Sequence, residues 1–187
     1  VGYISSGNCQ ALAPIAEELK QFTIFATCGT PRIFEEAERK YVFRTMGHAT
    51  SDNVAAAMYV KENFPDVKGY TGINQNYAWG QDSWRDFDLT MKQIMPNTKA
   101  SEKTQFPKIF AGQYGSEISA MSLDEADLVH SSFWGGDLEA FIFQGAARGL
   151  FDKKIGVVTV GGTAAYRLGK KLPDGLVLGA RGPYGIL

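Results

Sequence analysis

The fold class is decided by residues 137–160, which have the sequence DLEAFIFQGAARGLFDKKIGVVTV. The first half predicts a helix over 137–150, because apolar residues recur in it at three- and four-residue spacing. These residues are Leu138, Phe141, Ile142 and Ala146. The second half, 154–160, is a short and strongly apolar run that predicts a buried strand. A helix followed by a buried strand is typical of α/β folds with a parallel sheet.

The same alternation of strand and helix extends over the rest of the chain. The sequence predicts further strands at 2–5, 23–26, 41–46, 68–73, 99–105, 127–132 and 176–180. It predicts further helices at 8–22, 52–64, 82–95 and 116–126, the second of them capped by Ser51 or Asp52. We therefore expect an α/β fold built on doubly wound parallel sheets, without internal repeats or long linkers.

The composition is that of an ordinary globular protein. Of 187 residues, 44% are hydrophobic and 21% are charged, and 19 Lys and Arg nearly balance 20 Asp and Glu. A net charge of -1 without a basic block argues against a nucleic-acid partner, and no apolar run approaches the roughly 18 residues of a membrane span. Cys9 and Cys28 are too few for a disulfide framework and are not spaced as metal ligands, and whether they are bonded is left open.

Ligand contacts in parallel sheets gather in the loops that leave the carboxyl ends of strands. Here those loops are rich in small and aromatic residues: 5–8, 27–30, 74–80, 133–137 and 161–163. Ser6 leads into a helix, whose N-terminus favours an anion by about 0.3 to 2 kcal/mol. Ser6 therefore predicts a carboxylate site, and the alternative that Ser6 or Asn8 only caps the helix stays open.

Two tryptophans stand in such loops, each directly before a glycine. If Trp79 and Trp134 line a cleft, each offers a flat apolar face on which a ligand ring can stack, and the cleft suits an apolar or aromatic body. Packing into the core is the alternative for both.

The sequence contains no arrangement of residues typical of a metal site or of a serine or cysteine nucleophile. His48 and His130 have no carboxylate or cysteine at a metal spacing, and we interpret both as structural. Ser131 and Ser132 lack a Gly-x-Ser-x-Gly elbow, and Cys28 has no base nearby in sequence. We expect no catalytic residues, no metal and no cofactor.

Five short motifs, taken in order, carry a resemblance to a known family: 2–7 (GYISSG), 25–27 (FAT), 41–45 (YVFRT), 77–80 (YAWG) and 134–137 (WGGD). They resemble periplasmic solute-binding proteins of the branched-chain amino-acid type, the receptor components of ABC importers. The resemblance implies two α/β lobes of the type I periplasmic-binding-protein fold with a ligand cleft between them. By motif, 1–44 is a partial first lobe, 45–179 the second lobe and 180–187 a segment crossing back, so the sequence resembles a fragment with lobe one incomplete.

The resemblance also implies contacts. The carboxylate-binding serine of the family falls on Ser6, supported by the N–H of Gly7. Further candidate contacts fall on the loops of both lobes: Thr27, Cys28, Gly29, Tyr77, Trp79, Phe133 or Trp134, and Thr163.

One departure from the family bears on the ligand. Amino-acid binders place an acidic residue after the strand that matches 154–160, where this chain has Gly161, Gly162 and Thr163. The partner for a ligand ammonium is missing there, and Asp137, which also opens a helix, is the candidate replacement. We therefore expect a small carboxylate or amide with an apolar or aromatic body, although a branched-chain or aromatic amino acid stays open.

The resemblance implies a protein that is not an enzyme, acts with an ABC permease, and is periplasmic or extracellular, with a lipid anchor possible only through sequence before residue 1. The alternative functions are a sensor or regulatory domain of the same fold that reads amides or amino acids and, less favoured, an α/β enzyme acting on a small carboxylate. Because lobe one supplies about two strands and one helix, apolar residues such as Ile4, Ile24 and Phe25 are expected to lie open and to drive association.

Overall fold

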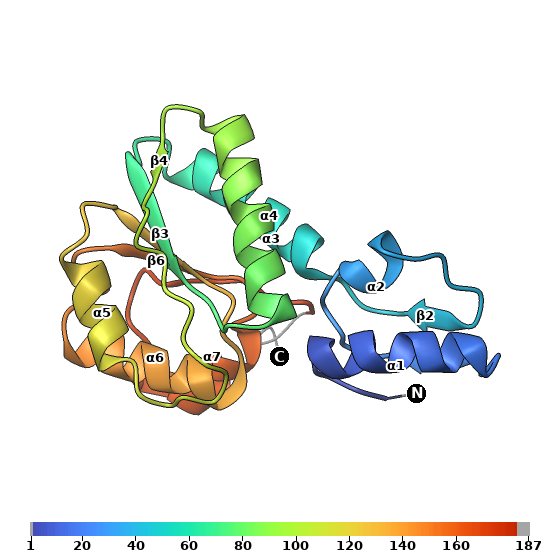
Figure 1. Ribbon diagram of the computed structural model, residues 1–187. Helices are drawn as coiled ribbons and strands as arrows, with labels where there is room; N and C mark the ends of the chain where they lie inside the picture. The colour runs from blue at the N-terminus through green and yellow to red at the C-terminus, as the bar shows by residue number, and fades with distance from the viewer. Residues whose placement is uncertain (1, 183–187) are drawn as a thin grey trace.

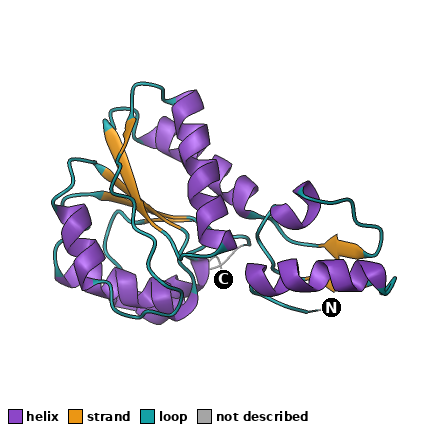
Figure 2. Ribbon diagram, in the orientation of Figure 1, coloured by secondary structure: helices purple, strands orange, loops and turns teal. Residues whose placement is uncertain are grey.

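Two separate parallel sheets organise the chain in the computed structural model, which describes residues 2–182 (Figures 1 and 2). The smaller sheet pairs β1 (Thr23–Phe25) with β2 (Val42–Arg44). The larger sheet has the order β4-β3-β5-β6-β7. Its strands are β3 (Gly69–Ile73), β4 (Lys99–Ala100), β5 (Leu128–Ser131), β6 (Ile155–Val158) and β7 (Val177–Leu178). All pairings are parallel, which confirms the predicted fold class.

Helices cover both faces of the larger sheet (Figure 2). One face carries α3 (Ala49–Asn63) and α4 (Ala78–Ile94), and the other carries α5 (Gly115–Ser122), α6 (Gly135–Ala147) and α7 (Gly162–Leu168). Neighbouring strand residues point to opposite faces, so Leu128 joins the core under α3 and α4 while Val129 joins the core under α5 and α6. Strands buried on both sides are mostly apolar, as in β6, but β5 also buries His130 and Ser131.

The smaller sheet is covered by α1 (Ser6–Glu18), which lies alongside β2 in Figure 1. A disulfide joins Cys9 of α1 to Cys28, with the two Cα atoms 6.2 Å apart. By restricting the unfolded chain, a closed loop of this length stabilises the fold by about 3 kcal/mol. The sequence left open whether Cys9 and Cys28 are bonded, and the structure shows that they are.

Coverage of the smaller sheet is one-sided. Phe25 is fully buried beneath α1, which corrects the expectation that it lies open. Ile4 is 66% exposed and Phe22 is 64% exposed, while Ile24 is half-buried. Association of the chain through these apolar side chains stays a prediction.

Some element boundaries differ from the predicted ones. Residues 2–5 form no strand, and only Gly2 pairs in an isolated bridge with Phe25. The predicted strand 99–105 is formed at Lys99–Ala100, after which Gln105 bridges to Ile73. Three short elements were not predicted: α2 (Arg32–Glu35), α7 and the 3-10 turn Gly169–Lys171. They have few residues and no clear apolar period, so tertiary contacts decide them.

The start of α3 also differs from the prediction. The helix begins at Ala49 with His48 in the N-cap position, ahead of the predicted Ser51 or Asp52. Ser51 Oγ instead accepts a hydrogen bond from the His48 N–H at 3.0 Å, from inside the first turn.

Two further findings hold for residues 2–182. No helix has the length and apolar character that crossing a membrane requires. No group of three or more His, Cys, Asp or Glu side chains comes together in an arrangement that could hold a metal ion.

Candidate functional site

A cavity of about 140 Å³ lies where the carboxyl ends of the two sheets meet. Its lining residues each follow a strand or, for the first two, the bridged residue Gly2. They are Ile4, Ser6, Thr27, Gly29, Tyr77, Trp79, Trp134, Val160 and Arg181. A larger hollow of about 700 Å³ beside β7 and α3 shares none of these lining residues, although its lining residue Asp52 pairs with Arg181. The shared position at the strand ends marks the cavity as the candidate ligand site.

The aromatic wall of the cavity is built at the point where the winding of the larger sheet reverses. β3 has β4 on one side and β5 on the other, so the loops after β3 and β5 diverge and open a crevice between them. Two hydrogen bonds cross it: Trp79 Nε1 donates to the Ser132 carbonyl at 2.8 Å, and Trp134 Nε1 donates to the Tyr77 hydroxyl at 2.9 Å. Both indoles are therefore fixed in orientation before any ligand enters.

Tyr77 and Trp79 combine structural and cavity-lining roles. Burial raises the pKa of Tyr77 to about 12, so its hydroxyl stays neutral at physiological pH. Trp79 is only 5% exposed and lines the cavity with the face that remains. Trp79 therefore packs into the core and also lines the cavity, so both alternatives given for it apply.

Gly29 faces this wall for a steric reason. A Cβ at that position would overlap the ring of Trp79 and would lie 3.3 Å from Arg181 Nη2. Glycine is thus the residue that lets the segment after β1 approach the wall closely.

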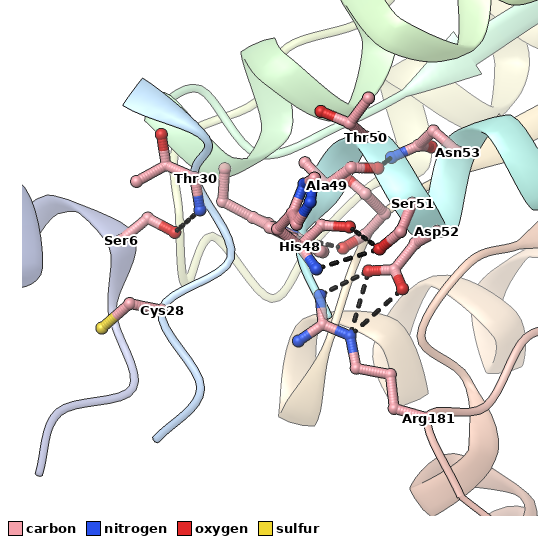
Figure 3. A network of polar contacts seen from close by, with 12 residues as sticks. Ser6, Cys28, Thr30, His48, Ala49, Thr50, Ser51, Asp52, Asn53 and Arg181 are labelled. Atoms are coloured by element: carbon pink, nitrogen blue, oxygen red, sulfur yellow. Dashed lines mark hydrogen bonds and ion pairs between the residues drawn. The ribbon is translucent and has the colours of Figure 1, made fainter. Parts of the chain in front are cut away.

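Ser6 lies at the start of α1 and is 2% exposed. Its Oγ accepts a hydrogen bond from the Thr30 N–H at 3.1 Å, as Figure 3 shows. Ser5, in the N-cap position, makes no side-chain capping bond. The first N–H groups of a helix have no intrahelical partner, so the start of α1 offers donors and a positive dipole end beside the cavity.

An ion pair with a buried carboxylate, Asp82, connects this side of the cavity to α4. Thr30 Oγ1 donates to Asp82 Oδ2 at 2.6 Å, and Arg32 Nε donates to Asp82 Oδ1 at 2.8 Å. Ser6 is therefore connected through Thr30 and Asp82 to the helix that carries Trp79, and the two halves of the cavity are held in register.

Six of the eleven sequence-predicted residues line the cavity: Ser6, Thr27, Gly29, Tyr77, Trp79 and Trp134. Gly7 and Thr163 are exposed outside it, and Cys28 is buried in the disulfide. Phe133 is fully buried, with its ring 5.0 Å from that of Tyr114. Of the alternatives Phe133 and Trp134, only Trp134 lines the cavity.

Asp137 also lies outside the cavity, and its suggested role as the partner of a ligand ammonium stays a prediction. It is 2% exposed in the first turn of α6. One oxygen, Oδ2, accepts hydrogen bonds from Gln75 Nε2 at 2.6 Å and from the Phe110 N–H at 2.8 Å. These two hydrogen bonds hold the carboxylate against the loop around Phe110.

Sequence reasoning missed three lining residues: Ile4, Val160 and Arg181. Ile4 lies in a predicted strand, Val160 ends one and Arg181 follows one, so their position near strand ends could have indicated them. Arg181 lay beyond the last predicted strand, and nothing in its neighbouring sequence showed that its side chain turns back to Trp79.

His130 is structural, as the sequence indicated. It is fully buried and stacked on Phe87 with ring centroids 4.2 Å apart. Its Nε2 lies 2.6 Å from Asn53 Oδ1 and its Nδ1 lies 3.4 Å from Asn74 Nδ2. These partners favour a neutral ring with the proton on Nε2, and burial lowers the pKa of His130 to about 3.

We expect His130 to make the protein sensitive to acid. Below pH 6.5 His130 is protonated in the unfolded chain but stays neutral in the folded chain. The free energy of unfolding therefore falls as the pH falls toward about 3. The loss is about 1.4 kcal/mol per pH unit, or about 2 kcal/mol at pH 5. Urea unfolding of wild type and His130→Gln at pH 7 and pH 5 measures it. Equal acid sensitivity of the two proteins would contradict this assignment.

Comparisons with known proteins agree with this architecture. The family model described as periplasmic binding protein matches residues 1–184. No curated protein matches the chain. Solved structures match at 14% to 20% identity, which supports the fold alone.

Three of these structures illustrate the similarity. The amino acid ABC transporter substrate-binding protein from Pseudomonas fluorescens Pf-5 has a TM-score of 0.80 at 14% identity, over 96% of this chain and 48% of its own. A solute binding protein of an ABC transporter from R. palustris, in complex with benzoate, has a TM-score of 0.76 at 20% identity, over 88% and 45%. A leucine binding protein from Thermotoga maritima has a TM-score of 0.73 at 16% identity, over 91% and 47%.

The chain thus spans less than half the length of these structures. The family model, in contrast, covers nearly all of its 187 residues. With its parallel sheets and a cavity at the strand ends, the chain belongs to the periplasmic binding protein family.

Proposed function

We propose that this chain forms part of the solute-binding component of an ABC importer and binds a small carboxylate or amide with an apolar or aromatic body and no amine. The observation that carries the proposal is the cavity lining, in which the described residues supply three aromatic side chains, the N-terminus of α1 and no carboxylate. An aromatic wall favours a flat apolar body, and hydrogen-bond donors at a helix start favour a carboxylate or carbonyl oxygen.

Within residues 2–182, no acidic side chain lines the cavity, and this argues against an amino-acid ligand. A buried ammonium needs a carboxylate partner, because its desolvation is otherwise uncompensated. Among the described residues that line the cavity, Arg181 is the one charged side chain, and it carries the same sign as an ammonium. Asp137 is held by Gln75 and Phe110. The benzoate complex of the R. palustris relative shows that this fold accommodates an aromatic acid.

We also propose a division of the chain into lobes, based on the motifs that resemble the family. Residues 1–44 belong to one lobe, 45–179 to the other, and the crossing segment begins at 180, of which 183–187 lie outside the described residues. A ligand that contacts both lobes stabilises a closed form that a membrane permease recognises, without chemical turnover. Family membership implies a periplasmic or extracellular location, and a disulfide persists in such an oxidising compartment. Lipid anchoring stays part of the proposal.

Titration calorimetry of the full-length protein with benzoate, benzamide and leucine tests the ligand class. We expect benzoate and benzamide to bind at least 10-fold more tightly than leucine. A 10-fold difference in Kd corresponds to only about 1.4 kcal/mol, and burying the unpaired ammonium of leucine costs more than that. Ser6→Ala should weaken benzoate binding by about 1.5 to 3 kcal/mol, since it removes a hydrogen bond to a charged group.

Ser116→Ala is the matched control, because Ser116 is an exposed serine at the start of another helix, α5. It should bind benzoate as the wild type does. Tighter binding of leucine than of benzoate and benzamide would overturn the proposed ligand class.

A further inference from the structure

Arg181 is the charged residue of the cavity. It follows β7 in the crossing segment, and its side chain is only 16% exposed. The guanidinium carbon lies 5.2 Å from the centroid of the Trp79 ring, within the range of a cation–π contact. The cation is thus placed directly on the aromatic wall.

Asp52 holds this guanidinium from one side. Arg181 Nε donates to Asp52 Oδ2 at 3.0 Å and to Oδ1 at 3.2 Å, and Nη2 also donates to Oδ2. Asp52 lies in the first turn of α3, and its side chain is 10% exposed. Because arginine presents a planar fork, this pairing fixes the direction of the remaining nitrogen.

That remaining nitrogen, Nη1, has no hydrogen-bond partner among the described residues. In Figure 3 it is turned away from Asp52, toward the side on which Ser6 and Cys28 lie. A Cβ at Gly29 would lie 3.3 Å from Nη2, so the glycine lets the loop after β1 come close to the guanidinium group. A fixed, mostly buried cation with an open donor therefore borders the cavity.

The charged group discussed next, the Arg44 guanidinium, is itself a hydrogen-bond donor and cannot accept from Arg181 Nη1. Arg44 Nη1 donates to the carbonyls of Cys28 at 3.1 Å and Thr30 at 2.7 Å. Burial, and then the proximity of Arg181, lower the pKa of Arg44, which places two guanidinium groups in one region. An anion in the cavity would relieve this repulsion as well as pair with Arg181.

We propose that Arg181 is the specificity-determining residue that makes the site prefer a carboxylic acid over the corresponding neutral amide. The inference rests on the proposed function and refines it. The donors at the start of α1 serve an acid and an amide alike, because both present a carbonyl-type oxygen. The cation of Arg181 adds an attraction that only the ionised acid receives.

The test compares benzoate with benzamide, which share the ring and differ in charge. In the full-length wild type we expect benzoate to bind about 10-fold or more tightly than benzamide by calorimetry. Arg181→Met should weaken benzoate binding by about 10- to 100-fold. Benzamide binding should change by less than about 3-fold, so the preference for the acid disappears.

Further variants separate recognition from structure. Arg181→Lys keeps a charge without the planar fork and should restore part of the acid preference. The double variant Arg181→Met, Asp52→Asn removes the carboxylate that Arg181→Met alone leaves unpaired, and should show the same lost preference with a higher Tm. Arg167→Met is the matched control, because Arg167 is an arginine with a 72% exposed side chain outside the cavity.

The outcomes distinguish this inference from the proposed function. An unchanged ratio of benzoate to benzamide affinity in Arg181→Met would overturn the role of Arg181 while the proposed function stands. Equal loss of both ligands in Arg181→Met and in the double variant would show a structural role and also overturn it. A wild type that binds neither compound would remove the proposed function, and the inference with it.

Discussion

Replacing Gly80 with alanine is expected to destabilise the protein by about 3 kcal/mol or more. A Cβ at Gly80 would overlap the backbone carbonyl oxygen of Gln75 and would lie 2.7 Å from its backbone nitrogen. Neither atom can rotate away, so the start of α4 has to move, and with it the neighbouring Trp79. Helix propensity alone predicts the opposite sign, since alanine exceeds glycine by about 1 kcal/mol within a helix.

Urea unfolding followed by circular dichroism measures this effect. Gly136→Ala is the matched control, because Gly136 is also in the first turn of a helix and a Cβ there has open space. The control should be neutral or slightly stabilising. A Gly80→Ala protein as stable as the wild type would show that the backbone at Gln75 can yield, contrary to this prediction.

Replacing Asp82 with alanine should cost about 3 kcal/mol, because it removes the buried carboxylate of an ion pair. Asp82 is fully buried, and it accepts hydrogen bonds from Thr30 and Arg32. Thr30 is buried as well and would lose its acceptor, while the 29% exposed side chain of Arg32 can regain some water. The variant should also bind benzoate more weakly, because Thr30 orients Ser6.

Urea unfolding and calorimetry with benzoate test both parts of this prediction. Asp66→Ala is the control, because Asp66 is an exposed aspartate in a turn between α3 and β3. An Asp82→Ala protein that matches this control in both measurements would show that the tie between α4 and the start of α1 contributes little.

The positions of some predicted binding residues are set by nearby secondary structure, and those of others by partners distant in sequence. The position of Ser6 and Trp79 beside the cavity could be predicted, because each stands in the first turn of a helix that begins shortly after a strand or a bridged residue. Their contact with a ligand stays a prediction. Phe133 and Asp137 stand in a similar loop but turn to other partners. Phe133 packs on Tyr114, and Asp137 is captured by Gln75 and Phe110. Those partners lie far away in sequence, so no local pattern announces them.

The sequence by itself determined the alternation of strands and helices, since apolar periodicity is a local property that burial on two faces requires. It also determined which loops could reach a ligand, through the resemblance of their motifs to a known family. Only the tertiary structure decided that Gly29 makes room for Trp79, that Cys9 meets Cys28, and that Arg181 turns back onto the aromatic wall. The physical reason is that steric fit and charge pairing depend on distances between segments, and the packing of the sheets sets those distances.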